Sequence, residues 1–210
     1  MNRFYGDLKM TWLKVILFAI ATGVYTGVVM LIPFLKDTSF QDIGIAYEWW
    51  VIFAVIVVVN CGKSWEAMLK CFVFFLISQP LVYLVEILFG KLSFDMGWLY
   101  YSSIWLPMTF LTLPGGFIAY FCKKQNVLGA IILGLGNTIQ AALALAYFGM
   151  AVKHFPFHLL SALVCVASIL VMSVFIQKER KNRLIAILLP IVLTAALLVL
   201  AKMTGRVFFV

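Results

Sequence analysis

The chain has 210 residues, of which 65% are hydrophobic and only 11% are charged, and its mean hydropathy is +1.09. Soluble domains carry about a quarter of their residues as charges, so this composition excludes an ordinary soluble domain and indicates a protein that lies in lipid. The net charge of +8 does not indicate a nucleic-acid partner, because the basic residues stand in short clusters between apolar runs.

Apolar runs long enough to cross a membrane follow one another along the chain. A membrane-spanning helix needs about 20 apolar residues, and an isolated strand in lipid would leave its backbone groups unsatisfied. The sequence therefore predicts a single all-α domain over residues 1–210, a polytopic transmembrane helix bundle with about seven spans. The expected spans are residues 11–34, 46–61, 65–89, 97–122, 127–149, 156–177 and 183–203.

The basic residues predict the orientation of the bundle. Cytoplasmic loops of membrane proteins are enriched in Lys and Arg, and an N-terminus inside with a C-terminus outside places most of the basic residues in the cytoplasm. The expected inner set is Arg3, Lys9, Lys14, Lys63, Lys70, Lys123, Lys124, Lys178, Arg180, Lys181 and Arg183. The expected outer set is Lys36, Lys91, Lys153, Lys202 and Arg206.

The first span carries small residues four apart, at Ala19, Gly23 and Gly27. Residues at this spacing share one face of a helix, and small side chains there let another helix approach closely. We interpret this ladder as a helix-packing face, directed either to another span of the chain or to a partner subunit.

The third span carries a polar stripe formed by Gln79, Tyr83 and Glu86. Their spacing puts the three side chains on one helical face, and Pro80 between them removes a backbone hydrogen bond. A carboxylate inside a span is costly if it faces lipid, so Glu86 is expected to face the bundle or water. The stripe predicts a substrate or cation site that opens outward, and interhelical hydrogen bonding is the alternative.

The fourth span contains Pro114, Gly115 and Gly116. Proline removes a donor and glycine loosens the backbone, and interrupted helices of this kind form binding sites in many transporters. We therefore add residues 114–116 to the candidate substrate site. No tandem or inverted repeat is evident in the sequence to support this interpretation.

The fifth span carries a longer small-residue ladder, at Ala130, Gly134, Thr138 and Ala142. Asn137 and Gln140 lie beside it and can form hydrogen bonds across a helix contact. Packing against another span or against a partner is the expected use of this face.

Signatures of catalysis and of metal binding are missing from the sequence. His154 and His158 are four apart, but Pro156 between them fits the first turn of a helix and would leave His154 outside it. We predict no metal site, no cofactor and no catalytic residues, since HExxH, GxSxG and Walker motifs are absent. The four cysteines form no CxxC pair.

Two segments carry a resemblance to known proteins. Glu48-Trp49-Trp50, and Leu69-Lys70-Cys71-Phe72 continuing to Ser78-Gln79-Pro80-Leu81, resemble uncharacterised multi-span proteins of Gram-positive bacteria. The resemblance implies the bacterial plasma membrane and transfers no activity. The chain is also similar in length to the substrate-binding subunits of energy-coupling-factor vitamin transporters, in which a small-residue motif on the first helix docks a partner. The ladder of the first span matches that motif, whereas those subunits typically have six helices.

The leading hypothesis is a small membrane transporter, or the membrane subunit of a transporter, with lipid and other membrane subunits as its partners. The first alternative is a scaffold, immunity or assembly protein that uses its ladders to bind helices. The second is a membrane enzyme acting at the outer face through Glu48, Glu86, Asp95 or His158.

Overall fold

The computed structural model describes residues 8–36, 38–45, 47–153, 155 and 157–204. Within these ranges the backbone is helical, with short turns and no strand. The all-α class predicted from the sequence is therefore confirmed for the described part of the chain.

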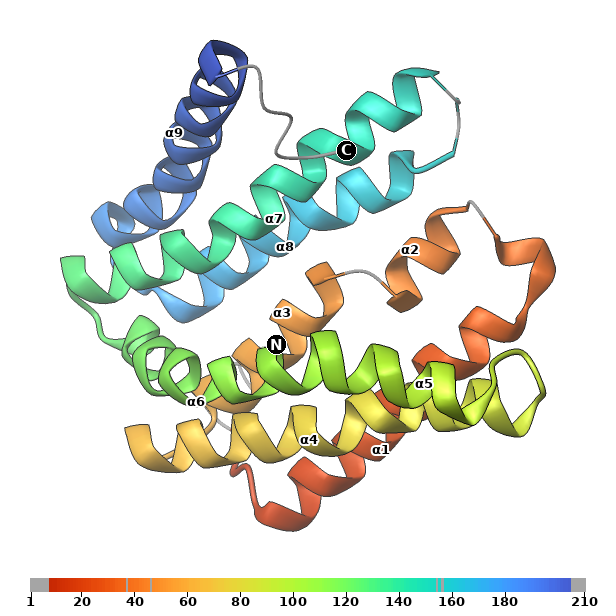
Figure 1. The fold of residues 1–210 in the computed structure, drawn as a ribbon. Helices are drawn as coiled ribbons and strands as arrows, with labels where there is room; N and C mark the ends of the chain where they lie inside the picture. The colour runs from red at the N-terminus through yellow and green to blue at the C-terminus, as the bar shows by residue number, and fades with distance from the viewer. Residues whose placement is uncertain (1–7, 37, 46, 154, 156, 205–210) are drawn as a thin grey trace. The chain divides into compact units, whose positions relative to one another are not determined.

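The helices fall into two compact units, and the boundary between them along the sequence lies near Tyr120. Unit 1 contains α1 (Trp12–Leu31), η2 (Pro33–Leu35), α2 (Ser39–Ile45), α3 (Tyr47–Val59), α4 (Ser64–Leu88), α5 (Phe94–Tyr100), η3 (Tyr101–Trp105) and α6 (Leu106–Ala119) (Figure 1). After η4 (Tyr120–Lys123), unit 2 contains α7 (Val127–Lys153), α8 (Leu159–Ile176) and α9 (Arg180–Thr204).

Six helices are long and apolar enough to cross a membrane within the described ranges, which is consistent with an integral membrane protein. They are Trp12–Leu31, Ser64–Leu88, Phe94–Lys123, Val127–Lys153, Leu159–Ile176 and Arg180–Thr204. The second expected span, residues 46–61, corresponds to α3, whose 13 residues measure about 20 Å at 1.5 Å per residue. This is shorter than a hydrocarbon core of about 30 Å.

In unit 1, α1 and α4 run in the same direction. Near the start of both helices, the Lys70 ammonium donates to the Met10 carbonyl. Farther along, Gly23 lies against Ser78, and Gly27 lies against Val85. Successive positions of α1 thus contact successive positions of α4, which is possible only if the helices are parallel.

α3, which lies between α1 and α4 in the sequence, packs on α4 and runs in the opposite direction. The Trp50 ring lies 6.2 Å from that of Phe74, whereas Val58 packs with Ala67 near the start of α4. The Asn60 side chain then accepts a hydrogen bond from the Leu8 backbone N–H at 2.9 Å. The chain therefore leaves α3 at the end of unit 1 where α1 begins.

Lys70 is buried at this end, although its charge counts toward the basic inner face expected from the sequence. It is 2% exposed, and it pairs with Glu66 one turn earlier on α4. Its ammonium also lies 5.5 Å from the centre of the Trp12 ring. A buried ammonium needs such partners because desolvation of an unpaired charge is costly, so Lys70 holds the start of α1 to α4.

After α4, the chain turns and returns along α4 through α5, η3 and α6 as one helix over Phe94–Lys123, which we call the linking helix. Gly116 of α6 lies against Cys71 near the start of α4, and Gly97 of α5 lies against Ile87 near its end. The segment Tyr101–Trp105 is a π-helix, directly before Pro107, whose ring cannot fit against the carbonyl four residues earlier in a regular helix.

Unit 2 is built on α7. The Gln125 side chain, just before α7, donates to the carbonyl of Ile176 at the end of α8, and the ring of Tyr147 near the other end of α7 stacks on that of His158. α7 and α8 are therefore antiparallel neighbours, as Figure 1 shows. α9 begins after a short turn at the end where α7 begins and packs mainly on α7.

Two three-helix groups result. We call α1, α3 and α4 the first triad, and α7, α8 and α9 the second triad. In each, the first and third helices leave the same end and the second returns.

Candidate functional site

The stripe predicted on α4 divides between two environments. Gln79 is 2% exposed, and its Nε2 has no hydrogen-bond partner among the described residues. The neighbouring Ser78 hydroxyl is also buried without a partner there. Nearly all buried polar atoms in proteins are hydrogen-bonded. A polar group bound beside Pro80 could therefore form hydrogen bonds with these two atoms.

Tyr83 and Glu86 lie farther along α4. The Tyr83 ring stacks on that of Tyr100 from α5, with 6.5 Å between centroids, and Glu86 is partly buried one turn later. Within the described chain, the Glu86 carboxylate forms no ion pair. It lies next to Ile87, which lines the groove described below.

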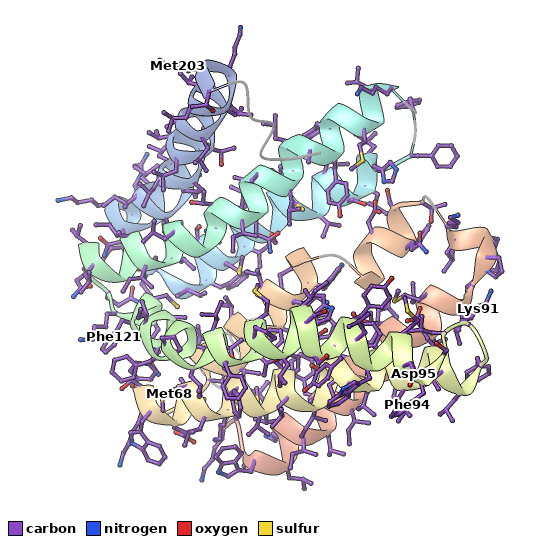
Figure 2. All side chains as sticks on the ribbon, viewed as in Figure 1. Met68, Lys91, Phe94, Asp95, Phe121 and Met203 are labelled. Carbon is purple, nitrogen blue, oxygen red and sulfur yellow. The ribbon has the colours of Figure 1, made fainter. Side chains whose placement is uncertain are left out.

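An apolar groove of about 440 Å³ lies between α1, α4 and the linking helix. Its lining is Ile20, Ile77, Pro80, Leu81, Tyr83, Leu84, Ile87, Phe94, Gly97, Trp98 and Tyr101. Of the six predicted substrate residues, only Tyr83 lines it. Figure 2 labels Lys91, Phe94 and Asp95 around the turn between α4 and α5, and of these three residues Phe94 lines the groove.

Pro114, Gly115 and Gly116 do not interrupt their helix. α6 runs continuously through them, so the interruption expected there lies instead at η3. Gly116 contacts Met68 and Cys71 of α4, about two helical turns before Gln79. The structure thus does not bring residues 114–116 together with Gln79 and Tyr83, and no unwound backbone is offered at Pro114.

The ladder of α1 faces α4. A Cβ on Gly23 would lie 2.5 Å from the Ser78 carbonyl oxygen, and a Cβ on Gly27 would lie 2.7 Å from the Val85 Cβ. Ala19 is fully buried in the core formed by α1, α3 and α4. Close approach of the backbones is therefore used inside the first triad.

The ladder of α7 is also directed inward. A Cβ on Gly134 would lie 2.9 Å from the Leu189 side chain of α9, and Ala130 and Ala142 are buried. The Thr138 hydroxyl donates to the Gly134 carbonyl at 3.0 Å, so it is satisfied within its own helix.

A second proline segment, which sequence reasoning missed, lies in α9. Pro190 has no N–H, so the carbonyl of Ala186 loses its usual donor four residues on. Asn137 of α7 donates its Nδ2 to that carbonyl at 3.3 Å and to the Ser173 hydroxyl at 3.2 Å. The sequence signal was available, since Pro190 stands in the middle of the seventh expected span.

Buried polar atoms near Pro190 also lack a partner within the described ranges. They are Asn137 Oδ1 and the hydroxyl of Thr194, one turn after the proline. Thr194 lines an apolar groove of about 370 Å³ between α7, α8 and α9. Pro190, like Pro80, therefore lies within a helix, near an apolar groove and near two buried polar atoms that lack a hydrogen-bond partner among the described residues.

The residues considered for catalysis are dispersed. Asp95 lies in the first turn of α5, and His158 precedes α8 with a left-handed backbone (φ 67°) and stacks on Tyr147 at 6.1 Å. His154 and the side chain of Glu48 lie outside the described residues. In the described part of the chain, no group of three or more His, Cys, Asp or Glu side chains could hold a metal ion.

Compared with known proteins, the chain matches no family model, no curated protein and no solved structure.

Proposed function

We propose that the chain is a small membrane transport protein, or the membrane subunit of a transporter, for a small polar solute. The observation that carries the proposal is that the two triads share one plan. In each, a glycine of the first helix lies against the third helix directly before a proline of that helix: Gly23 lies against Ser78, before Pro80, and Gly134 lies against Leu189, before Pro190.

This plan supports transport because many transporters are built from structural repeats, including parallel repeats related by an axis along the membrane normal. Proline-interrupted helices at corresponding positions of the two repeats are the feature that most often marks their substrate path. A rigid scaffold has no need for two matched weak points in equivalent helices.

The polar atoms beside the prolines support the class of solute. Gln79 Nε2 is a donor, Asn137 Oδ1 is an acceptor, and the hydroxyls of Ser78 and Thr194 can serve as either. A ligand that satisfies either pair of atoms, the one beside Pro80 or the one beside Pro190, carries hydrogen-bonding groups of its own. We therefore favour a small neutral or zwitterionic polar solute over an apolar one.

We further propose seven crossings, with the N-terminus inside and the C-terminus outside. The parallel contact of α1 and α4 supports this count, because a chain that crosses along α1 must return before it can cross along α4. Between α1 and α4, the described residues form η2, α2 and the short α3, which supply the return crossing in this proposal. The basic clusters support the orientation.

The location and partners are also proposals. The bacterial plasma membrane follows from the resemblance of the segments around Trp50 and Gln79. The partner that we propose is a coupling subunit that supplies the nucleotide-binding motif missing from this sequence. The first-helix ladder is filled by α4, so such a partner would dock elsewhere. For the same reason, no contact of the ladders favours the scaffold alternative.

The transport proposal is tested by accessibility at position 79. The four native cysteines are replaced by serine or alanine, Gln79→Cys is introduced, and a membrane-impermeant maleimide is applied separately to right-side-out and inside-out vesicles. A transport protein exposes its substrate path to each side in turn, so labelling is expected from both sides.

Leu76→Cys is the matched control, because Leu76 lies one turn earlier on α4 with an exposed apolar side chain and should meet lipid rather than water. Labelling of position 79 from neither side, or equal labelling of position 76, would contradict the proposal. A tag on the C-terminus that reacts only with reagents in the cytoplasm would contradict the orientation.

A further inference from the structure

Two basic segments of unit 2, residues 121–126 and 177–183, are held together by side-chain amides. Gln177, which is fully buried, donates to the carbonyls of Cys122 at 2.5 Å and Lys124 at 3.2 Å. Gln125 donates to the Ile176 carbonyl at 2.8 Å and accepts from the Lys178 backbone N–H at 2.7 Å. The two segments therefore form one cross-linked end of the unit, which we call the basic cluster.

The basic cluster carries many cations and one acid. Its cations are Lys123, Lys124, Lys178, Arg180, Lys181 and Arg183, and its acid is Glu179. The Glu179 carboxylate accepts a hydrogen bond from the Asn182 amide at 3.1 Å. It forms no ion pair with Lys178, Arg180, Lys181 or Arg183 within the described residues.

Arg183 is positioned rather than free to move away. Its Nε donates to the Gln177 carbonyl at 2.6 Å, which fixes the plane of the guanidinium and leaves its two Nη groups without a described protein partner. A planar guanidinium of this kind is suited to phosphate oxygens, which it can bind in a bidentate manner. On the other segment, the Lys124 ammonium lies 4.7 Å from the centre of the ring of its own segment's Phe121.

This arrangement is electrostatically unfavourable by itself. Like charges repel, and here neutral amide hydrogen bonds hold six cations at one end with Glu179 as the one acid in the two segments. α7 and α9 also begin here, and the N-termini of these 27- and 25-residue helices add partial positive charge. A bound anion would relieve the repulsion.

The surface beside the cations indicates which anion fits. Val127, Leu128 and Leu184 are exposed apolar side chains in the first turns of α7 and α9, directly next to the basic segments. A free phosphate would leave these side chains uncovered. A phospholipid offers a phosphate and, next to it, the hydrocarbon that covers them.

We propose that the basic cluster binds the headgroup of an anionic phospholipid, such as phosphatidylglycerol, in the membrane leaflet at that end of unit 2. Figure 2 shows Phe121 at this end and Met203 near the opposite end of α9. The proposal is independent of transport, since it rests on the connections at one membrane face and not on the proline segments.

The test measures binding of fluorescent phosphatidylglycerol to the full chain in a neutral detergent, with phosphatidylcholine as the reference lipid. The variant Lys124→Gln/Arg183→Gln should weaken phosphatidylglycerol binding by about thirtyfold, because each of the two basic side chains near an anionic lipid surface contributes about 1 kcal/mol. The control variant Lys36→Gln/Lys153→Gln removes two exposed cations outside the basic cluster, one after η2 and one at the end of α7, and should leave binding unchanged.

Further arms separate the possible outcomes. Arg183→Lys keeps the charge and the fold but loses the planar fork, and it should weaken binding less than Arg183→Gln. Equal affinity for the two lipids, or an equal loss in the control variant, would overturn the proposal. Displacement by millimolar inorganic phosphate as complete as displacement by phosphatidylglycerol would show a simple anion site and would also overturn it.

Discussion

The Nδ2 of Asn137 lies 3.3 Å from the carbonyl oxygen of Ala186 and donates a hydrogen bond to it across two helices. This carbonyl is the one that Pro190 deprives of its backbone donor. Asn137 thus repairs, from α7, the backbone of α9 at the place where α9 is weakest.

Asn137→Ala should destabilise the protein by about 0.5–2 kcal/mol, because it leaves a buried carbonyl unsatisfied. Pro190→Ala restores the donor within α9, so Asn137→Ala should have a much smaller effect in that background. Unfolding by denaturing detergent, measured for both single variants and the double variant, gives their coupling. Strictly additive effects would show that Asn137 does not act through Pro190.

Gly23→Ala should destabilise the first triad, since the added methyl group would lie 2.5 Å from the Ser78 carbonyl oxygen, a backbone atom that cannot rotate away. Gly115→Ala is the matched control, because a Cβ there has no neighbour within 4 Å and alanine favours the helix by about 1 kcal/mol over glycine. The same unfolding assay should move the two variants in opposite directions. An unchanged Gly23→Ala protein would contradict the packing of α1 on α4.

Lys70→Met should lower the free energy of unfolding by about 1–3 kcal/mol, because both the Glu66 carboxylate and the Met10 carbonyl lose the Lys70 ammonium as a partner. Lys63→Met, at an exposed position just before α4, should change it little. Adding Glu66→Leu to Lys70→Met should recover part of the loss, since it removes the unpaired carboxylate. If the double variant were less stable than Lys70→Met, the pairing would not be the cause.

The four cysteines should resist modification in the folded protein. Cys61, Cys71 and Cys122 are each 3% exposed and Cys165 is fully buried. A water-soluble maleimide should therefore label the protein only after denaturation, as followed by intact mass. Rapid labelling in mild detergent would show that these ends of the helices open.

Much of the fold could be predicted from hydropathy, because a span must be apolar along its whole length. The long helices around Ala19, Gln79 and Gly134 follow that rule. Hydropathy could not distinguish the short α3 from a full-length transmembrane span, because the residues just before Trp49 are apolar enough to be counted in the same span. The length of a helix depends on its packing as well as on its composition.

The site was harder to predict because its features are contacts between helices. The sequence shows that Gly23 and Gly134 are small, but not that each faces a proline-bearing helix. The two triads share a helix topology but not a similar amino-acid sequence, so no sequence repeat is evident. At Pro114 the local rule failed, since neighbouring residues can accommodate a proline within a continuous helix.

The π-helical segment Tyr101–Trp105 has a consequence for the linking helix as a whole. Gly97 is buried before the segment, Tyr101 is buried as its first residue, and Thr109, Gly116 and Cys122 are buried after it. Two turns of regular helix from Tyr101 would bring Met108 to the buried side, yet Met108 is exposed and Thr109 takes its place. One residue has been absorbed, a phase slip of about 100°. The linking helix therefore keeps one continuous axis, but the helical register of its buried positions shifts by one residue at the π-helical segment. Removing one residue from this segment should restore a single register along the whole helix.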